Sequence, residues 1–163
     1  MILSTHAIVG AAIASFMPNH PVLAFLAGAA SHFAIDAIPH SDYPLRSISI
    51  KRDRSAVSVN WLLLRDLGMI AFDAVAGLTI ALQLFAGLET VAAVLLGAMG
   101  GILPDPLQFA HRLYPKEPLR SLQRFHAWTH TKKSLSWPWA IISQVLFVVV
   151  VVVIAKAALL NLT

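Results

Sequence analysis

The chain of 163 residues is 58% hydrophobic and only 12% charged, and its mean hydropathy is +0.74. This composition excludes an ordinary soluble domain of this length and predicts an integral membrane protein. Cysteine is absent, which excludes disulfides and thiolate ligands and leaves imidazole and carboxylate as the strong side-chain metal ligands. The net charge is +4, but the basic residues flank apolar segments, so we expect contact with membrane lipid and no nucleic-acid partner.

The apolar sequence divides into five segments, at residues 2–17, 21–38, 58–85, 90–103 and 140–162. Short breaks at 18–21 and 86–89 join the first four segments into two helical hairpins. The last segment is long enough to cross a hydrocarbon core of about 30 Å. The first has no basic region before it, so we expect a retained helix and not a cleaved signal peptide. The predicted fold is an all-α integral membrane bundle of about five helices in a single domain.

Residues 1–44 and 58–115 form a candidate repeat of two hairpins, followed by a basic loop at 116–138 and a C-terminal transmembrane helix at 139–163. Matching Gly28 with Gly97 places Asp36 and Asp105 eight residues after their glycines. A genuine parallel repeat would produce this match, and so would two unrelated segments rich in small residues. Both interpretations are open.

The topology follows from the basic residues. All but one of the lysines and arginines lie at 46–65 and 112–133, and the two hairpin turns have none. The positive-inside rule places both basic stretches in the cytoplasm, with the C-terminus outside. We therefore expect a multi-pass protein of the bacterial inner (cytoplasmic) membrane.

Histidine and aspartate residues gather at the segment ends on this same cytoplasmic side. His32, Asp36 and His40 are spaced i, i+4, i+8 along one helix face, although Pro39 ends the regular helix before His40. His-x-x-x-His in the basic loop has the i, i+4 spacing at which two imidazoles chelate one ion. Either group alone is also common without a metal, but together they predict a divalent-metal site, with Zn or Mn favoured over Mg. The predicted metal ligands are His6, His32, Asp36, His40, Asp105, His126 and His130.

Two further aspartates, Asp66 and Asp73, lie i, i+7 on one face of the third segment. A charge at the depth of Asp73 costs about 2.5 to 3.5 kcal/mol on insertion, so such a residue is usually functional or paired. We predict catalytic roles for Asp66 and Asp73, one of them as the general base. The alternative is a buried pair with Arg65 or a histidine, or a protonated Asp73.

Four motifs together resemble the bacterial membrane-bound metal-dependent hydrolase families: Thr5-His6, the stretch from Ser31 to His40, Leu103-Pro104-Asp105, and His126-Ala-Trp-Thr-His130. The resemblance implies a helical membrane protein whose metal site includes His6, His32, Asp36, Asp105, His126 and His130. Proline follows Asp105 where a second acidic residue would complete the motif, so the resemblance leaves the number of metals open.

We expect a hydrolase that uses one or two divalent ions to cleave a phosphoester of a lipid or lipid-linked substrate at the cytoplasmic face. The rival expectation is a divalent metal or proton carrier without hydrolytic activity, in which Asp73 and Asp66 lead to the cluster. A third is a scaffold whose histidines only pair polar groups. Polar residues continuing across the far half would indicate transport, and the sequence offers there only Gln83, Glu89 and Gln144.

Overall fold

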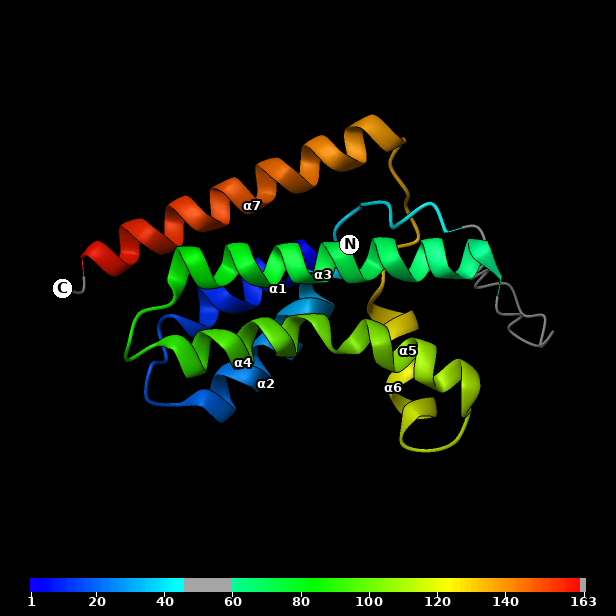
Figure 1. Cartoon of the computed structure of the whole chain (residues 1–163), viewed down its shortest axis with the longest axis horizontal. Coiled ribbons are helices and arrows are strands. Elements are labelled where there is room, and N and C mark those ends of the chain that lie inside the picture. Colours follow the sequence, from blue (N-terminus) through cyan, green and yellow to red (C-terminus); the bar gives the residue numbers. More distant parts are fainter. Residues whose placement is uncertain (46–59, 162–163) are drawn as a thin grey trace.

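The computed structural model describes residues 1–45 and 60–161, and within these ranges the chain forms seven α-helices and no strand (Figure 1). The predicted all-α class is confirmed. Residues 46–59, which hold most of the first basic stretch and the expected start of the third segment, lie outside the described residues, as do 162–163. The helices are α1 (Leu3–Ala14), α2 (Pro21–Asp36), α3 (Trp61–Phe85), α4 (Val91–Ile102), α5 (Pro104–Leu113), α6 (Leu119–Thr129) and α7 (Trp137–Leu160).

Five of these helices match the five predicted apolar segments, and α5 and α6 are additional. α5 begins at Pro104, which has no N–H to continue α4, and the chain bends there by 44°. α6 forms inside the stretch expected to be a basic loop. The predicted count of about five helices is therefore not confirmed. Neither is the hairpin repeat, since α1 has 12 residues and its supposed counterpart α3 has 25.

Two helices, α3 and α7, are long and apolar enough to cross a membrane, and the bent pair α4–α5 is a third if it crosses as one span. Both long helices expose large apolar side chains, including Phe72 and Val75 on α3 and Val149 and Val153 on α7. Surfaces of this kind are stable against lipid and unfavourable in water. The two or three helices that are long and apolar enough to span thus support a membrane protein. They do not account for all five predicted apolar segments.

Helix α1 lies at the centre of the bundle, where it packs against α2, α3, α4 and α7, and nearly all of its residues are buried. Glycines allow its backbone to approach α4 closely. A Cβ on Gly10 would lie 2.3 Å from the Gly97 carbonyl oxygen, and one on Gly28 of α2 would lie 2.1 Å from the same atom. Close backbone contact at small residues is typical of helix packing in membranes.

The helix directions bring the polar residues to one end of the bundle. Helices α1, α3 and α7 begin, and α2 and α4 finish, towards the right of Figure 1, where α5 and α6 also lie. We call this the site end. His6 lies in the first turn of α1, Asp36 is the last residue of α2, and Asp105 lies in the first turn of α5.

Candidate metal centre

Asp36 is the centre of a buried cluster of imidazoles, and only 1% of its side chain is exposed. Its Oδ2 lies 3.2 Å from Nε2 of His32 and 3.1 Å from Nε2 of His126. Its Oδ1 lies 3.2 Å from Nε2 of His6. Two more imidazoles stand slightly further away, with Nε2 of His40 at 3.7 Å and Nε2 of His130 at 3.9 Å from the carboxylate. The structure thus brings together residues that are up to 124 positions apart in the sequence, from His6 to His130.

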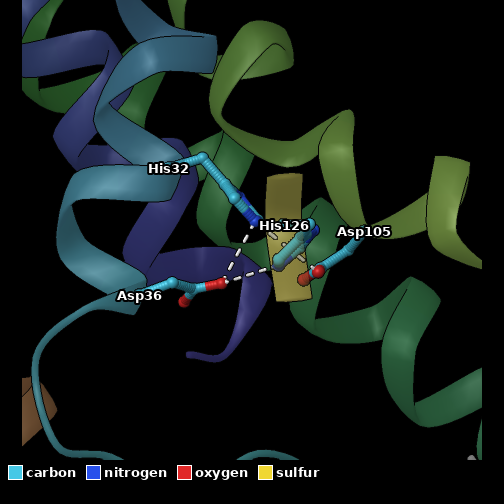
Figure 2. Close-up of side chains that lie close together, drawn as sticks. All are labelled: His32, Asp36, Asp105 and His126. Atoms are coloured by element: carbon cyan, nitrogen blue, oxygen red, sulfur yellow. Dashed lines mark hydrogen bonds and ion pairs between the residues drawn. The ribbon is translucent and has the colours of Figure 1, made fainter. Parts of the chain in front are cut away.

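One compact ligand group consists of His32, Asp36, Asp105 and His126, whose ligand atoms all lie within 4.8 Å of one another. In Figure 2, His32 and Asp36 project from α2, Asp105 from α5 and His126 from α6. Nε2 of His32 is 3.6 Å from Oδ1 of Asp105. Two ligands held about 2.0 to 2.2 Å from one ion lie about 3 to 4.3 Å apart, so this spacing suits a divalent cation.

Backbone carbonyls orient three of the imidazoles. Nδ1 of His32 lies 2.8 Å from the carbonyl oxygen of Gly101. Nδ1 of His40 lies 2.7 Å from the oxygen of Ile38, and Nδ1 of His130 lies 2.9 Å from the oxygen of Thr131. A carbonyl only accepts, so each Nδ1 carries the hydrogen, and a neutral ring then turns the Nε2 lone pair towards the carboxylates. A lone pair facing a carboxylate is unfavourable unless a proton or a metal cation lies between them. Carbonyls that fix metal-binding histidines in this way are common around metal sites.

His6 and His126 each have a buried Nδ1 that has no hydrogen-bond partner among the described residues. His6 is stacked on His32, with the ring centroids 3.9 Å apart. Nε2 of His126 is also 3.2 Å from the side-chain nitrogen of Gln108. The same Gln108 nitrogen donates to Oδ1 of Asp105 over 3.0 Å. Gln108, which the sequence patterns did not indicate, therefore links two members of the ligand group.

The first turn of α1, which carries His6, is held by side chains from distant parts of the chain. The Ile2 N–H donates to Gln144 over 3.0 Å, the Leu3 N–H to the Tyr43 hydroxyl over 2.8 Å, and the Ser4 N–H to Asp73 over 2.9 Å. These contacts satisfy N–H groups that have no partner within the helix. They also place Gln144 at the site end, which corrects its assignment to the far half of the last helix.

The two predicted catalytic aspartates have partners outside the imidazole cluster. Asp66 is fully buried, and its Oδ1 lies 3.5 Å from Nη1 of Arg65, whose side chain is 37% exposed. Asp73 accepts hydrogen bonds from the Ser4 N–H and the Tyr43 hydroxyl. For Asp73 this geometry supports a role in holding α1. The catalytic roles of both residues stay predictions.

Asp42 is a site residue that the sequence patterns missed. Its Oδ1 lies 3.1 Å from Nε2 of His40, and its Oδ2 lies 3.6 Å from Nε2 of His130. Burial raises the pKa of Asp42, but hydrogen bonds from His130 and His40 outweigh it, so the pKa lies well below the usual range. The hydrogen bond to Asp42 also raises the pKa of His130. The only signal in the sequence was an acidic residue two positions after a histidine.

His126 and His130 do not lie on one helix as the expected i, i+4 pair. α6 ends at Thr129, and the backbone of His130 is extended, so the two rings lie 5.8 Å apart between centroids. His126 belongs to the ligand group with Asp105, whereas His130 belongs to a second group with Asp36 and His40. The structure thus assigns the two histidines to different ligand groups, and chelation of a single ion by the pair stays a prediction.

Comparisons with protein-family models, with curated proteins and with solved structures found no match. The resemblance to membrane-bound metal-dependent hydrolases thus stays a prediction, and the function must be argued from the geometry of the site.

Proposed function

We propose that this protein is a metal-dependent hydrolase of the bacterial inner membrane, which cleaves a phosphoester of a lipid or lipid-linked substrate at the cytoplasmic face. The observation that carries the proposal is the buried carboxylate of Asp36, which faces Nε2 of His32 and Nε2 of His126 at 3.1 to 3.2 Å. Imidazole with carboxylate favours Zn or Mn over Mg as the bound ion.

The residues divide the chemistry among them. His32, Asp36, Asp105 and His126 would hold the cation, which lowers the pKa of water and stabilises negative charge on phosphoryl oxygens. A water oxygen forms the new bond to phosphorus as the ester P–O bond breaks. The water proton passes to a carboxylate base, which then returns it to the leaving oxygen. Asp66 and Asp73 are the proposed candidates for the base, and the contacts of Asp73 with Ser4 and Tyr43 favour Asp66.

A lipid phosphoester is the substrate class that suits the position of the cluster. Exposed tryptophans lie at the start of α3 (Trp61), the end of α6 (Trp128) and the start of α7 (Trp137 and Trp139), all at the site end. Tryptophan is enriched at the membrane–water interface, so these residues support a position of the cluster at headgroup level. Basic residues of α5 and α6, such as Arg112 and Arg120, would attract an anionic headgroup.

The rival function, a metal or proton carrier, lacks a polar path. Beyond His6, the main buried cluster around α1 consists of Ala7, Ile8, Ala11 and their apolar neighbours from α3, α4 and α7. In the described part of the chain, the buried polar side chain beyond the end of α1 is Ser15, whose hydroxyl donates to the Ala12 carbonyl over 2.7 Å. An ion that left the His/Asp cluster towards the far end would have to cross this apolar core, and burying a charge there costs free energy. This cost favours hydrolysis at the site end over transport.

The test combines metal content with a substrate screen. Protein purified in detergent should contain Zn or Mn, and His32→Ala and Asp36→Ala should lose it, whereas His20→Ala in the far turn should keep it. The wild type should hydrolyse a phospholipid or a lipid-linked phosphate, and Asp105→Asn should abolish turnover in a folded protein. A wild type without turnover on any of these substrates, whose variants change metal uptake into vesicles, would establish the carrier instead.

A further inference from the structure

The two oxygens of Asp36 face different sets of ligands. Oδ2 faces His32 and His126, as described above. Oδ1 faces the other way, with His6 at 3.2 Å and His40 at 3.7 Å. A carboxylate arranged in this way can bridge two cations, one on each oxygen.

A second ligand group includes His40, which lies on the Oδ1 side, and His130, whose Nε2 is 3.9 Å from Oδ2 of Asp36. Ligand atoms of Asp36, His40 and His130 lie within 4.8 Å of one another. Asp42 adds another carboxylate, 3.1 Å from Nε2 of His40 and 3.6 Å from Nε2 of His130. Because both histidines donate Nδ1–H to backbone carbonyls, their Nε2 atoms are directed at these carboxylates.

A cationic group already lies within this second set. The α-amino nitrogen of Met1 is 2.7 Å from Oδ1 of Asp36, 3.1 Å from Oδ1 of Asp42 and 2.8 Å from Nε2 of His40. Two carboxylates and an imidazole around one positive charge indicate that this position favours a cation, independently of the spacing of the ligand atoms.

We propose that the protein binds two divalent ions bridged by Asp36, the first held with His32, Asp105 and His126 and the second with His40, Asp42 and His130. This rests on the proposed function, whose metal centre it extends. The second ion would displace the α-amino group of Met1 from this position. Two divalent cations against three carboxylates then leave one net positive charge, which suits an anionic phosphoester. Two-metal sites stabilise both the attacking and the leaving oxygen of such a substrate.

The two ions differ in access. In the second group, the side chains of Asp42 and His130 are 46% and 30% exposed. In the first group, the side chain of Asp105 is 27% exposed, and those of His32 and His126 are at most 1% exposed. The second ion therefore faces the solvent and the headgroup region. A chelator should remove it before the first, and substrate phosphate should reach it first.

Metal stoichiometry tests the proposal. Wild-type protein equilibrated with Zn²⁺ should hold two ions per chain by elemental analysis, Asp42→Asn should hold one, and Asp36→Ala should hold none. Asp42 is half-exposed, so its variant should fold, as gel filtration in detergent would check; His130→Gln provides a second route to the same loss. With Mn²⁺, the electron paramagnetic resonance spectrum should show two exchange-coupled ions in wild type and an isolated ion in Asp42→Asn.

One ion per wild-type chain, unchanged in Asp42→Asn and His130→Gln, would overturn the second site. If that protein still hydrolyses phosphoesters, the proposed function stands with a single ion. Two coupled ions in a protein without hydrolytic activity would support the bridged pair of ions and refute the proposed hydrolase.

Discussion

The Nδ1–H of His32 donates to the carbonyl oxygen of Gly101 over 2.8 Å, and this contact joins the candidate metal centre to the packing of α4 against α1. Gly101 itself lies so close to α1 that a Cβ there would be 2.4 Å from the carbonyl oxygen of His6. The carbonyl of Gly101 therefore orients the imidazole of His32. Because Gly101 has no side chain, α4 can also approach the α1 backbone that carries His6.

Replacing this glycine should damage the site without touching a ligand. Gly101→Ala would force α4 away from α1 and move the carbonyl that directs His32, so metal affinity should fall by about 10- to 100-fold. Gly68→Ala on the exposed face of α3 is the matched control, because no atom lies within 4 Å of its added Cβ. It should keep metal affinity and preserve or raise stability, by up to about 1 kcal/mol. Competition with a chelator and thermal unfolding in detergent measure both effects, and equal affinities would refute the role of Gly101.

Asp73 should prove structural. Asp73→Ala removes the acceptor of the Ser4 N–H, and Tyr43→Phe removes the acceptor of the Leu3 N–H, so each should lower the free energy of unfolding by about 1 to 3 kcal/mol. Thermal unfolding in detergent measures the loss. Asp73→Asn keeps an acceptor oxygen and should retain most of the turnover. If Asp73→Asn instead keeps stability and metal while turnover falls about 10²- to 10⁴-fold, Asp73 is the general base.

The pKa of His130 should depend on Asp42. It is raised above its ordinary value of 6.5, first by the hydrogen bond from the imidazole to Asp42. In metal-free protein, proton binding to His130 therefore stabilises the folded state below pH 6.5, and this contribution is lost as the pH rises through the raised pKa. Asp42→Asn should lower the pKa of His130, which a histidine NMR titration of chelator-treated protein would measure. An unchanged pKa would mean that Asp42 does not contact His130 in solution.

The topology should read in, out, in, out for reporter fusions after Tyr43, Leu88, Lys116 and Thr163. Tyr43 follows α2 and Lys116 follows α5, both at the site end, whereas Leu88 lies in the turn between α3 and α4 at the other end. A periplasmic signal at Lys116 together with a cytoplasmic signal at Tyr43 would place the two halves of the cluster on opposite sides of the membrane. The proposed hydrolase would then be wrong.

Local patterns in the sequence determined α1 to α4, α7 and the chemical types of the candidate ligands, but they did not indicate α5 and α6. Apolar runs set the lengths of α3 and α7, Pro21 begins α2, and the absence of cysteine restricts strong side-chain ligands to imidazole and carboxylate. The i, i+4 spacing of His32 and Asp36 also holds, because both lie on one face of a continuous helix.

Only the tertiary structure decided how the ligands are shared. The backbone is extended at His130, and a loop brings Asp42 beside its ring, with Oδ2 of Asp42 3.6 Å from Nε2 of His130. Asp73 likewise meets the start of α1 across 69 residues of sequence. Such relationships depend on the distances and angles between packed helices, which glycine contacts set, and a spacing rule that applies within one helix carries no information about them.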